Sequence, residues 1–284
     1  MNVTQSWWDK FWTEKSAATS ANGPQAGAWA DLVWQVGLEE LETLFRQRAA
    51  GKKMLECGCG SARVSRYMAE RGYACMLLDY SPQALAMAKA AFAAASLKGE
   101  FILGDMNRLP LADNLFDVVY SGGVLEFFDD VSVPLREIVR VLKPGGLFVA
   151  GIVPNKFSCQ TLADLERTCA HSLKSFFTFR WQDIFLRLNH LPSGVSRASL
   201  KDYAAAFESS GLSGVTGYGT TPFPALSLGR FGERLYVRVL KRLLPQWRRF
   251  NRSHSSWSEK WGMAYVVYGV KSNNSVFEKP AAHE

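Results

Sequence analysis

The sequence has none of the features that direct a chain into a membrane or a secretory route. Its 284 residues contain no apolar stretch long enough to span a bilayer. The first residues, MNVTQSWWDKFW, lack the basic start, the continuous apolar run and the small-residue cleavage site of a secretory signal. We therefore expect a cytoplasmic protein. With 48% hydrophobic residues the chain can bury a sizeable core, which argues against a disordered chain.

The spacing of cysteine and histidine residues gives little support for a metal site or a disulfide framework. The five cysteines are an odd number without a CxxC pair, and the four histidines show no metal-ligand spacing. We expect reduced, mostly buried thiols and no metal site. Among the histidines, His190 is the one to test as a base, because it lies in the region expected to cover the site.

Excess positive charge is confined to one segment. The net charge is +7, and residues 230–252 hold eight basic residues against Glu233 alone. Apolar residues recur there at helical spacing, which predicts an amphipathic basic helix broken near Pro245. The pattern fits packing on the sheet with solvated arginines, and it equally fits peripheral docking on an anionic membrane surface. Nucleic acid is not the expected partner.

Residues 51–153 alternate short apolar runs with amphipathic stretches, which predicts βαβ units and a mostly parallel sheet. The expected strands cover residues 53–56, 73–78, 101–103, 116–120 and, after a Lys-Pro-Gly-Gly turn, 147–150. Beyond this region, a helix ending at Gly211 and a strong last strand over 263–268 are expected. The first fifty residues are aromatic-rich and helical in pattern.

Glycines follow the first of these strands, at a predicted strand-to-helix turn. Gly58 and Gly60 let the backbone approach a ligand closely, because no Cβ intervenes. The dinucleotide fingerprint G-x-G-x-x-G requires a third glycine where this chain has Arg63. A nicotinamide cofactor is therefore disfavoured.

Acidic residues end three successive strands. They are Glu56, Asp79 and Asp105. Carboxylates there would repel a pyrophosphate, but they suit a ligand with a ribose, an adenine and a positively charged amino-acid portion. Asp79 can accept from both ribose hydroxyls, and Asp105 from the adenine amine.

Four segments together resemble a known family. They are LECGCGSARVSRYMAERGY, LLDYSPQALAMA, GDMNRLPLADNLFDVVYSGGVLEFF and LREIVRVLKPGGLFVAG. Residues 50–153 resemble the class I S-adenosylmethionine-dependent methyltransferases, with a type 11-like domain. The resemblance implies an α/β, Rossmann-like, mostly parallel seven-stranded sheet flanked by helices. It also implies an antiparallel last strand in WGMAYVVYGVK, an N-terminal helical cap and a helical lid insertion.

The resemblance implies S-adenosylmethionine as the cofactor and assigns residues to it. Carried over position by position, the resemblance places Glu56 near the amino-acid end of the cofactor, and Gly58 and Gly60 where the backbone approaches the cofactor closely. Asp79 would bind the ribose, and Asp105 and the Met106 backbone would contact adenine. Ser121 lies where the chain passes the methionine moiety. The chain departs from the family at two positions. Ala62 replaces the usual third glycine, and Phe127 replaces a frequent histidine, so no catalytic base is identified.

Two features near this site have alternative interpretations. Glu126 is expected to be a solvated loop acid or a helix-capping partner, with a substrate-facing role as the alternative. The aromatic residues Trp7, Trp8, Phe11 and Trp12 are expected to pack in the core of the N-terminal cap, or else to wall a pocket.

The expected organisation has four parts: a helical cap over 1–50, a cofactor-binding core over 51–153, a substrate lid with the basic helix and closing strands over 154–272, and a tail over 273–284. The leading function is methyl transfer to a small or lipid-like acceptor, because the lid region is rich in Phe, Trp and Leu. The alternatives are an RNA or protein methyltransferase and a non-catalytic partner subunit. The scaffold does not identify the acceptor, and the sequence leaves the oligomeric state open.

Overall fold

Seven strands form one sheet in a computed structural model that describes residues 4–22, 27–166 and 196–272. The strand order is β3-β2-β1-β4-β5-β7-β6. The bounds are β1 Lys53–Cys57, β2 Ala74–Asp79, β3 Glu100–Leu103, β4 Phe116–Gly122, β5 Leu142–Ile152, β6 Leu212–Thr220 and β7 Ala264–Lys271. The first five strands are parallel, and β7 is antiparallel to both β5 and β6. The expected sheet, with its antiparallel last strand, is confirmed.

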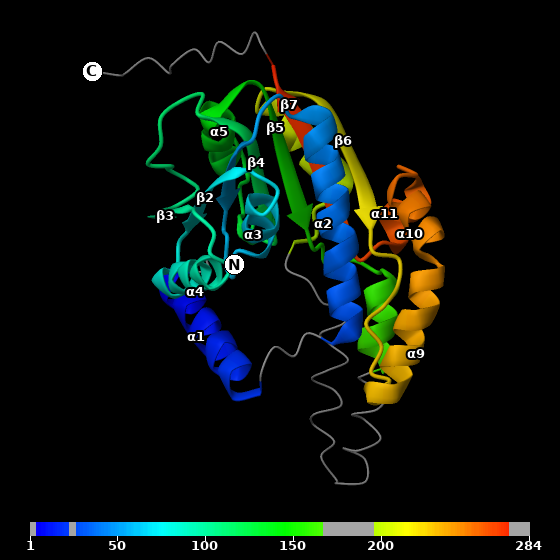
Figure 1. Ribbon diagram of the computed structural model, residues 1–284. Helices are drawn as coiled ribbons and strands as arrows, with labels where there is room; N and C mark the ends of the chain where they lie inside the picture. Colours follow the sequence, from blue (N-terminus) through cyan, green and yellow to red (C-terminus); the bar gives the residue numbers. More distant parts are fainter. Residues whose placement is uncertain (1–3, 23–26, 167–195, 273–284) are drawn as a thin grey trace, which may run out of the picture.

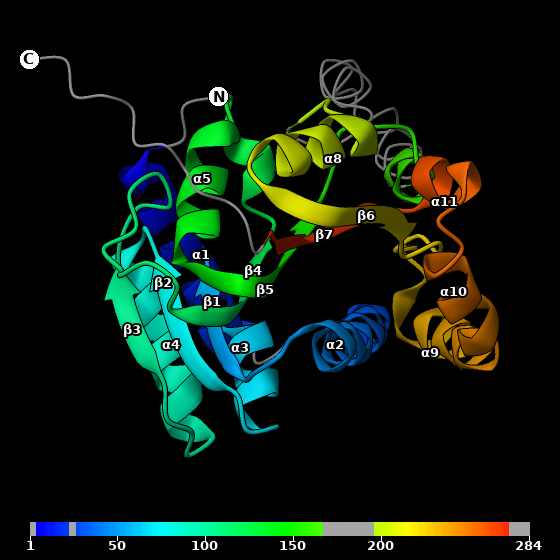
Figure 2. The same ribbon diagram turned by 90° about the horizontal axis from the view of Figure 1, so that it is seen from above.

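Helices cover both faces of this sheet (Figures 1 and 2). Their bounds are α1 Gln5–Asn22, α2 Ala28–Arg48, α3 Arg63–Ala69, α4 Pro82–Ala94, α5 Ser132–Val141, α8 Leu200–Ser209, α9 Gly229–Arg242, α10 Leu244–Asn251 and α11 Ser256–Trp261, with a short 3-10 helix over Leu125–Phe127. Figure 2 shows α5 and α8 on one face of the sheet, and α2, α3 and α4 on the other. The molecule is thus a three-layer α/β/α sandwich.

Each face of the sheet has its own hydrophobic core. On the α5 and α8 side, Phe148 of β5 stacks on Phe207 of α8 with ring centroids 4.9 Å apart. On the other side, Phe45 and Phe92 are fully buried together with Met54 of β1. A third, smaller cluster joins α2 to α9 and α10. Burial on both faces explains why β2, β4 and β5 in the middle of the sheet are rich in buried apolar residues.

Two local expectations need correction or refinement. The Lys-Pro-Gly-Gly turn does not precede the fifth strand but lies within it, because Leu142 already pairs with Phe116 before the register shifts. Gly145, with φ +74°, accommodates the irregularity. The break in the basic helix falls at Leu243, and Pro245 lies in the first turn of α10, where proline costs no hydrogen bond.

The N-terminal region forms two helices with different positions. α2 packs on the sheet face next to α3, whereas α1 contacts α4 and lies below it in Figure 1, toward the end at which the parallel strands finish. In the described part of the chain, no helix is both long and apolar enough to cross a membrane.

Candidate cofactor and acceptor site

The glycine loop lies directly after β1 and leads into α3. Gly58 and Gly60 have φ values of +72° and +50°, which favour glycine. The N–H of Gly58 donates to the carbonyl of Leu78 on β2, at 2.8 Å. A Cβ at Gly58 would overlap the side chain of Val124. Both backbone conformation and space therefore favour glycine at position 58, at the carboxyl edge of the sheet.

Asp79 braces this loop from the neighbouring strand. Its Oδ2 accepts from the Gly60 N–H at 2.8 Å, and its Oδ1 accepts from the Ser81 N–H at 2.9 Å. The side chain is buried, and burial raises its pKa although the backbone donors oppose the shift. A carboxylate oxygen has lone pairs beyond one bond, so Asp79 keeps acceptor capacity for a ligand.

Glu56 lies under the loop, in the interior. It is 4% exposed, and its Oε2 accepts from the Ser65 N–H in the first turn of α3, at 2.9 Å. Burial raises the pKa of Glu56 to about 7, and the nearby Asp79 adds to the shift. An acceptor at this helix start satisfies a backbone donor that has no partner within the helix.

The remaining predicted residues lie along the same edge. Asp105 follows β3 and is partly exposed, and its Oδ1 accepts from the backbone and side-chain amides of Asn107, which shapes a turn. Met106 is buried in the core. Ser121 of β4 is 1% exposed and pairs with Cys57 of β1, and its Oγ has no hydrogen-bond partner among the described residues.

Arg63 is not free to meet a pyrophosphate. It begins α3, and its guanidinium lies over the ring of Trp34 at 4.6 Å from the centroid. Ala62, in the place of a family glycine, takes the left-handed conformation with φ 56°. The loop thus accepts alanine there at the cost of some backbone strain.

Helix α1 covers the glycine loop. A Cβ at Gly60 would overlap the indole of Trp12, so that ring rests directly on the loop. Trp8 packs edge-on against Phe127 at 4.9 Å, and Asp9 accepts from the Ser81 hydroxyl. The expectation of simple core packing is wrong for Trp7 and Phe11, which are 44% and 37% exposed. The alternative, aromatic residues that wall a site, agrees with the contacts of Trp8 and Trp12.

Glu126 is buried and not a solvated loop acid. It is 4% exposed, its Oε1 accepts from the Val153 N–H at 3.1 Å, and its Oε2 has no partner in the described parts of the chain. Burial raises the pKa of Glu126 to about 6. No local pattern signals this burial, because it comes from the carboxyl end of β5, which is distant along the chain. Glu126 therefore joins the group of buried acids at this edge.

Replacing Glu126 by glutamine should change how stability depends on pH. A folded pKa near 6, above the ordinary value of 4.5, means that the unfolded chain loses this proton first as pH rises. The stability contributed by the neutral acid is present below pH 4.5 and is lost as pH rises through 6. We expect Glu126→Gln to be about 2 kcal/mol more stable than the wild type at pH 8.

Urea unfolding at pH 4 and pH 8 measures this effect. The gain should vanish near pH 4, and Glu208→Gln, the same substitution at an exposed position of α8, is the control. A Glu126→Gln variant that is less stable than the wild type at pH 8 would show that the buried carboxylate has a partner that outweighs its desolvation.

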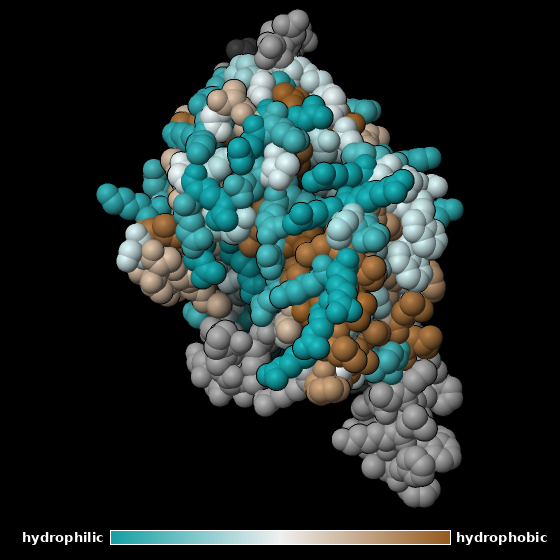
Figure 3. Space-filling view, turned by 45° about the vertical axis from the view of Figure 1, so that its right-hand side comes forward, coloured by the Kyte–Doolittle hydropathy of each residue, from teal (hydrophilic) through white to brown (hydrophobic). Residues whose placement is uncertain are grey.

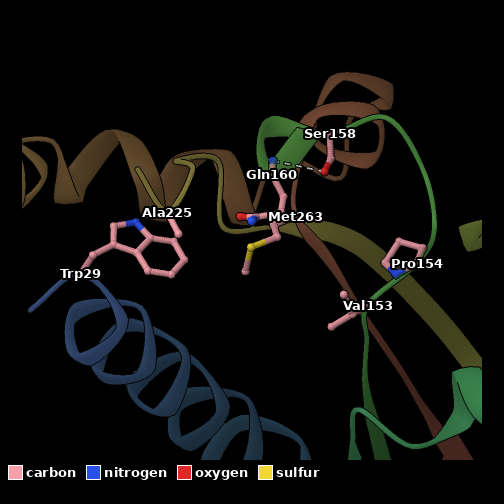
Figure 4. A pocket seen from close by; sticks show the side chains of 7 residues that line it. All are labelled: Trp29, Val153, Pro154, Ser158, Gln160, Ala225 and Met263. Carbon is pink, nitrogen blue, oxygen red and sulfur yellow. Dashed lines mark hydrogen bonds between the residues drawn. The ribbon is translucent and has the colours of Figure 1, made fainter. Parts of the chain in front are cut away.

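A cavity of about 360 Å³ lies at the end of β5, next to Val153 and Pro154 (Figure 4). Its lining residues are Trp29, Val153, Pro154, Ser158, Gln160, Ala225 and Met263. Trp29 Nε1 and Gln160 Oε1 are buried without hydrogen-bond partners in the described chain. The glycine loop does not line this cavity. Glu126 contacts the lining of the cavity through its bond to the Val153 N–H.

Cys57 and Cys59 flank Gly58 in the glycine loop, and of the four histidines the structure describes His254 alone. The four described cysteines, Cys57, Cys59, Cys75 and Cys159, are buried free thiols. Within the described ranges, no cluster of His, Cys, Asp or Glu could hold a metal ion. His190 and the expected tail 273–284 lie outside the described residues.

Comparison with known proteins identifies the core. Residues 55–150 match the methyltransferase domain family. A malonyl-[acyl-carrier protein] O-methyltransferase of Pectobacterium atrosepticum is 34% identical over 136 residues, 47% of this chain and 51% of that protein. The protein of the same name in Erwinia billingiae is 28% identical over 240 residues, 82% of this chain and 86% of the relative. For the two curated relatives that are 34% identical, the chain spans about half of the relative's length.

A solved structure supports the fold. A SAM-dependent methyltransferase from Thermotoga maritima has a TM-score of 0.52 at 15% identity, over 93% of this chain and 98% of that one. The buried Ser121 oxygen, which has no partner in the described chain, is a feature that a bound ligand would explain. The chain therefore carries a class I S-adenosylmethionine-dependent methyltransferase domain.

Proposed function

We propose that the protein transfers a methyl group from S-adenosylmethionine to a small or lipid-like acceptor that enters the cavity beside β5. The observation that carries this proposal is the position of the cavity at the carboxyl edge of the sheet. Open α/β sheets bind their ligands at this edge. The cavity is lined mainly by apolar side chains and, among the described residues, by no charged one. An apolar acceptor fits such a lining better than a polyanion does.

The cofactor roles extend this proposal to named residues. Asp79 would accept from the ribose hydroxyls while it holds Gly60, and Asp105 with the Met106 backbone would contact adenine. Glu56, Gly58 and Ser121 would line the methionine portion. The cofactor supplies an electrophilic methyl group, so the chain has only to bind, to align the acceptor and to exclude water. Trp12 and Trp8 of α1 are placed to exclude water above the loop.

Glu126 is the group best placed to take a proton from the acceptor. Its Oε2 is buried without a partner in the described structure, and its Oε1 is bonded to the N–H of Val153, which lines the cavity. With a pKa of about 6 it is mostly ionised near pH 7.5. A carboxylate in that state can accept the proton of a hydroxyl or an ammonium acceptor.

Three of the four expected parts have a role in this proposal. Residues 51–153 would hold the cofactor, α1 would cap it, and the region from 154 to 272 would shape the acceptor site. The relatives are named malonyl-[acyl-carrier protein] O-methyltransferase. Malonyl is an acyl group, so their names support an acceptor of acyl character.

Methyl transfer from labelled S-adenosylmethionine to three acceptor classes tests this function: acyl thioesters and free fatty acids, purified RNA, and peptides. We expect label in the acyl class alone. For an acceptor that must lose a proton, Glu126→Gln should slow transfer with unchanged cofactor affinity, whereas an ionised fatty acid has no proton to lose and should be methylated at the wild-type rate. The exposed variant Glu208→Gln is the control and should transfer at the wild-type rate. Label in RNA or peptides alone would contradict the proposed acceptor class.

A further inference from the structure

One face of α9 and of the residue before it exposes large apolar side chains. Leu228, Phe231, Leu235 and Val239 are 44%, 84%, 51% and 44% exposed. They are spaced by three and four residues, so they form one continuous stripe along the helix. We call these four residues the α9 stripe.

Helix α9 is packed against the protein by the face opposite the α9 stripe. The opposite face of α9 carries Val237 and Leu240, which pack with Leu32 and Val36 of α2. Glu233 also turns toward α2, where its Oε1 accepts from the Trp29 N–H at 3.1 Å. The helix is therefore anchored by one apolar face, while the second apolar face points away from the protein.

Basic side chains border the stripe. Arg234, Arg238, Lys241 and Arg242 are all exposed, and the structure records no ion pair for them in its described residues. By contrast, Arg248 of α10 pairs with Glu39 at 2.6 Å. Figure 3 shows hydrophobic side chains gathered on the side of the molecule that carries α9, with hydrophilic ones around them. The single acid of α9, Glu233, faces inward and neutralises none of this charge at the surface.

The combination indicates one kind of partner. A nucleic acid would use the basic side chains but would not favour exposed phenylalanine and leucine. A purely apolar protein partner would leave the unpaired cations buried at a cost. An anionic lipid surface takes both, because apolar side chains enter the acyl boundary while arginines meet the headgroups. We propose that α9 docks in the plane of an anionic membrane surface through the α9 stripe and its bordering bases.

The geometry also connects this surface to the cavity. Ala225 lines the cavity and lies three residues before Leu228, and Trp29, held by Glu233 of α9, lines it as well. A lipid-like acceptor would then reach the cavity from the membrane side. Binding to vesicles requires neither cofactor nor acceptor, so membrane docking and the proposed function can fail independently.

Co-sedimentation with vesicles tests the docking. The full-length protein, without cofactor, is mixed with sucrose-loaded vesicles of phosphatidylcholine alone or with about 30% phosphatidylglycerol, an anionic fraction chosen to give a strong surface potential. We expect binding to the anionic vesicles, weakened by salt, and little binding to the neutral ones. Leu235→Ser combined with Phe231→Ser, and separately Arg234→Gln combined with Arg238→Gln, should each weaken the partition at least about tenfold.

Matched controls separate docking from damage to the fold. Leu103→Ser changes a leucine that is 53% exposed on β3, close to the 51% of Leu235, and should bind as the wild type does. Arg66→Gln combined with Arg197→Gln removes two exposed arginines elsewhere and should also leave binding unchanged. All variants should keep the cofactor affinity of the wild type.

Three outcomes would overturn the inference. One is a wild-type protein that stays in the supernatant with anionic vesicles. Another is binding that needs the arginines but not Phe231 and Leu235, which would indicate a polyanion as partner. The third is a concentration-dependent dimer, lost in the Phe231→Ser and Leu235→Ser variant, without vesicle binding, which would assign the stripe to a second copy of the chain.

Discussion

Replacing Asp79 by alanine is expected to weaken S-adenosylhomocysteine binding by about 1.5 to 3 kcal/mol, the range for hydrogen bonds to a charged group. This corresponds to a roughly tenfold to 150-fold increase in Kd. The variant would lose the proposed contact with the ribose and the bracing of the loop, since Asp79 holds the Gly60 N–H at 2.8 Å and the Ser81 N–H at 2.9 Å. Titration calorimetry measures the change directly.

Two further variants test whether the loss of affinity comes from the Asp79 carboxylate. Asp79→Asn keeps one oxygen acceptor but loses the charge, so its affinity should lie between those of the wild type and Asp79→Ala. Glu208→Ala, on the exposed side of α8, should bind as the wild type does. An Asp79→Ala variant that is folded, by circular dichroism, and binds with unchanged Kd would show that the ribose lies elsewhere.

Replacing Phe148 by alanine is expected to lower the free energy of unfolding by about 3 to 5 kcal/mol. Phe148 is fully buried in β5, and its ring stacks on Phe207 with an interplanar angle of 24°. Truncation would leave a cavity between the sheet and α8, which the surrounding strands cannot fill. Urea unfolding followed by tryptophan fluorescence measures the loss.

The control for this variant is the same substitution at an exposed site. Phe231→Ala removes a ring that is 84% exposed and should change stability by less than about 0.5 kcal/mol. A loss below about 1 kcal/mol for Phe148→Ala would contradict the tight packing between β5 and α8. Phe148→Leu, which keeps most of the buried volume, should lose less than the alanine variant.

The core of the fold is predictable from local patterns. The strands over residues 53–57 and 74–79 are mostly apolar because both faces of the sheet are covered. Gly58 follows the first strand, and Asp79 ends the second, at the carboxyl edge. The observed sheet confirms the predicted fold class, and the match of residues 55–150 to the methyltransferase domain family confirms the predicted family. The fifth strand begins earlier than its pattern predicts, because periodicity cannot show that Leu142 pairs with Phe116 ahead of a bulge.

The candidate site is predictable only in part. Gly58, Gly60 and Asp79 follow strand ends, so the parallel sheet brings them together, as the bond from Gly60 to Asp79 shows. Their contacts with the cofactor remain predictions. The expectation of a solvated Glu126 is wrong, because its burial depends on Val153, which is remote along the chain and adjacent only in the folded sheet.

The position of α1 does not follow from the sequence either. Its aromatic residues recur on one helical face, and that pattern is the same for core packing and for covering a site. The contact between Trp12 and Gly60 joins segments almost fifty residues apart and depends on how α1 packs on α4. The α9 stripe is ambiguous for the same reason, since the pattern shows two apolar faces but not which of them has a partner.

The most direct test of the cofactor assignment is titration calorimetry of the wild-type protein with S-adenosylmethionine, S-adenosylhomocysteine and NADH. We predict that the first two bind and that NADH does not, because the loop lacks the third glycine and Arg63 packs on Trp34. Binding of NADH alone, or of none of the three ligands, would contradict the assignment of this site to S-adenosylmethionine.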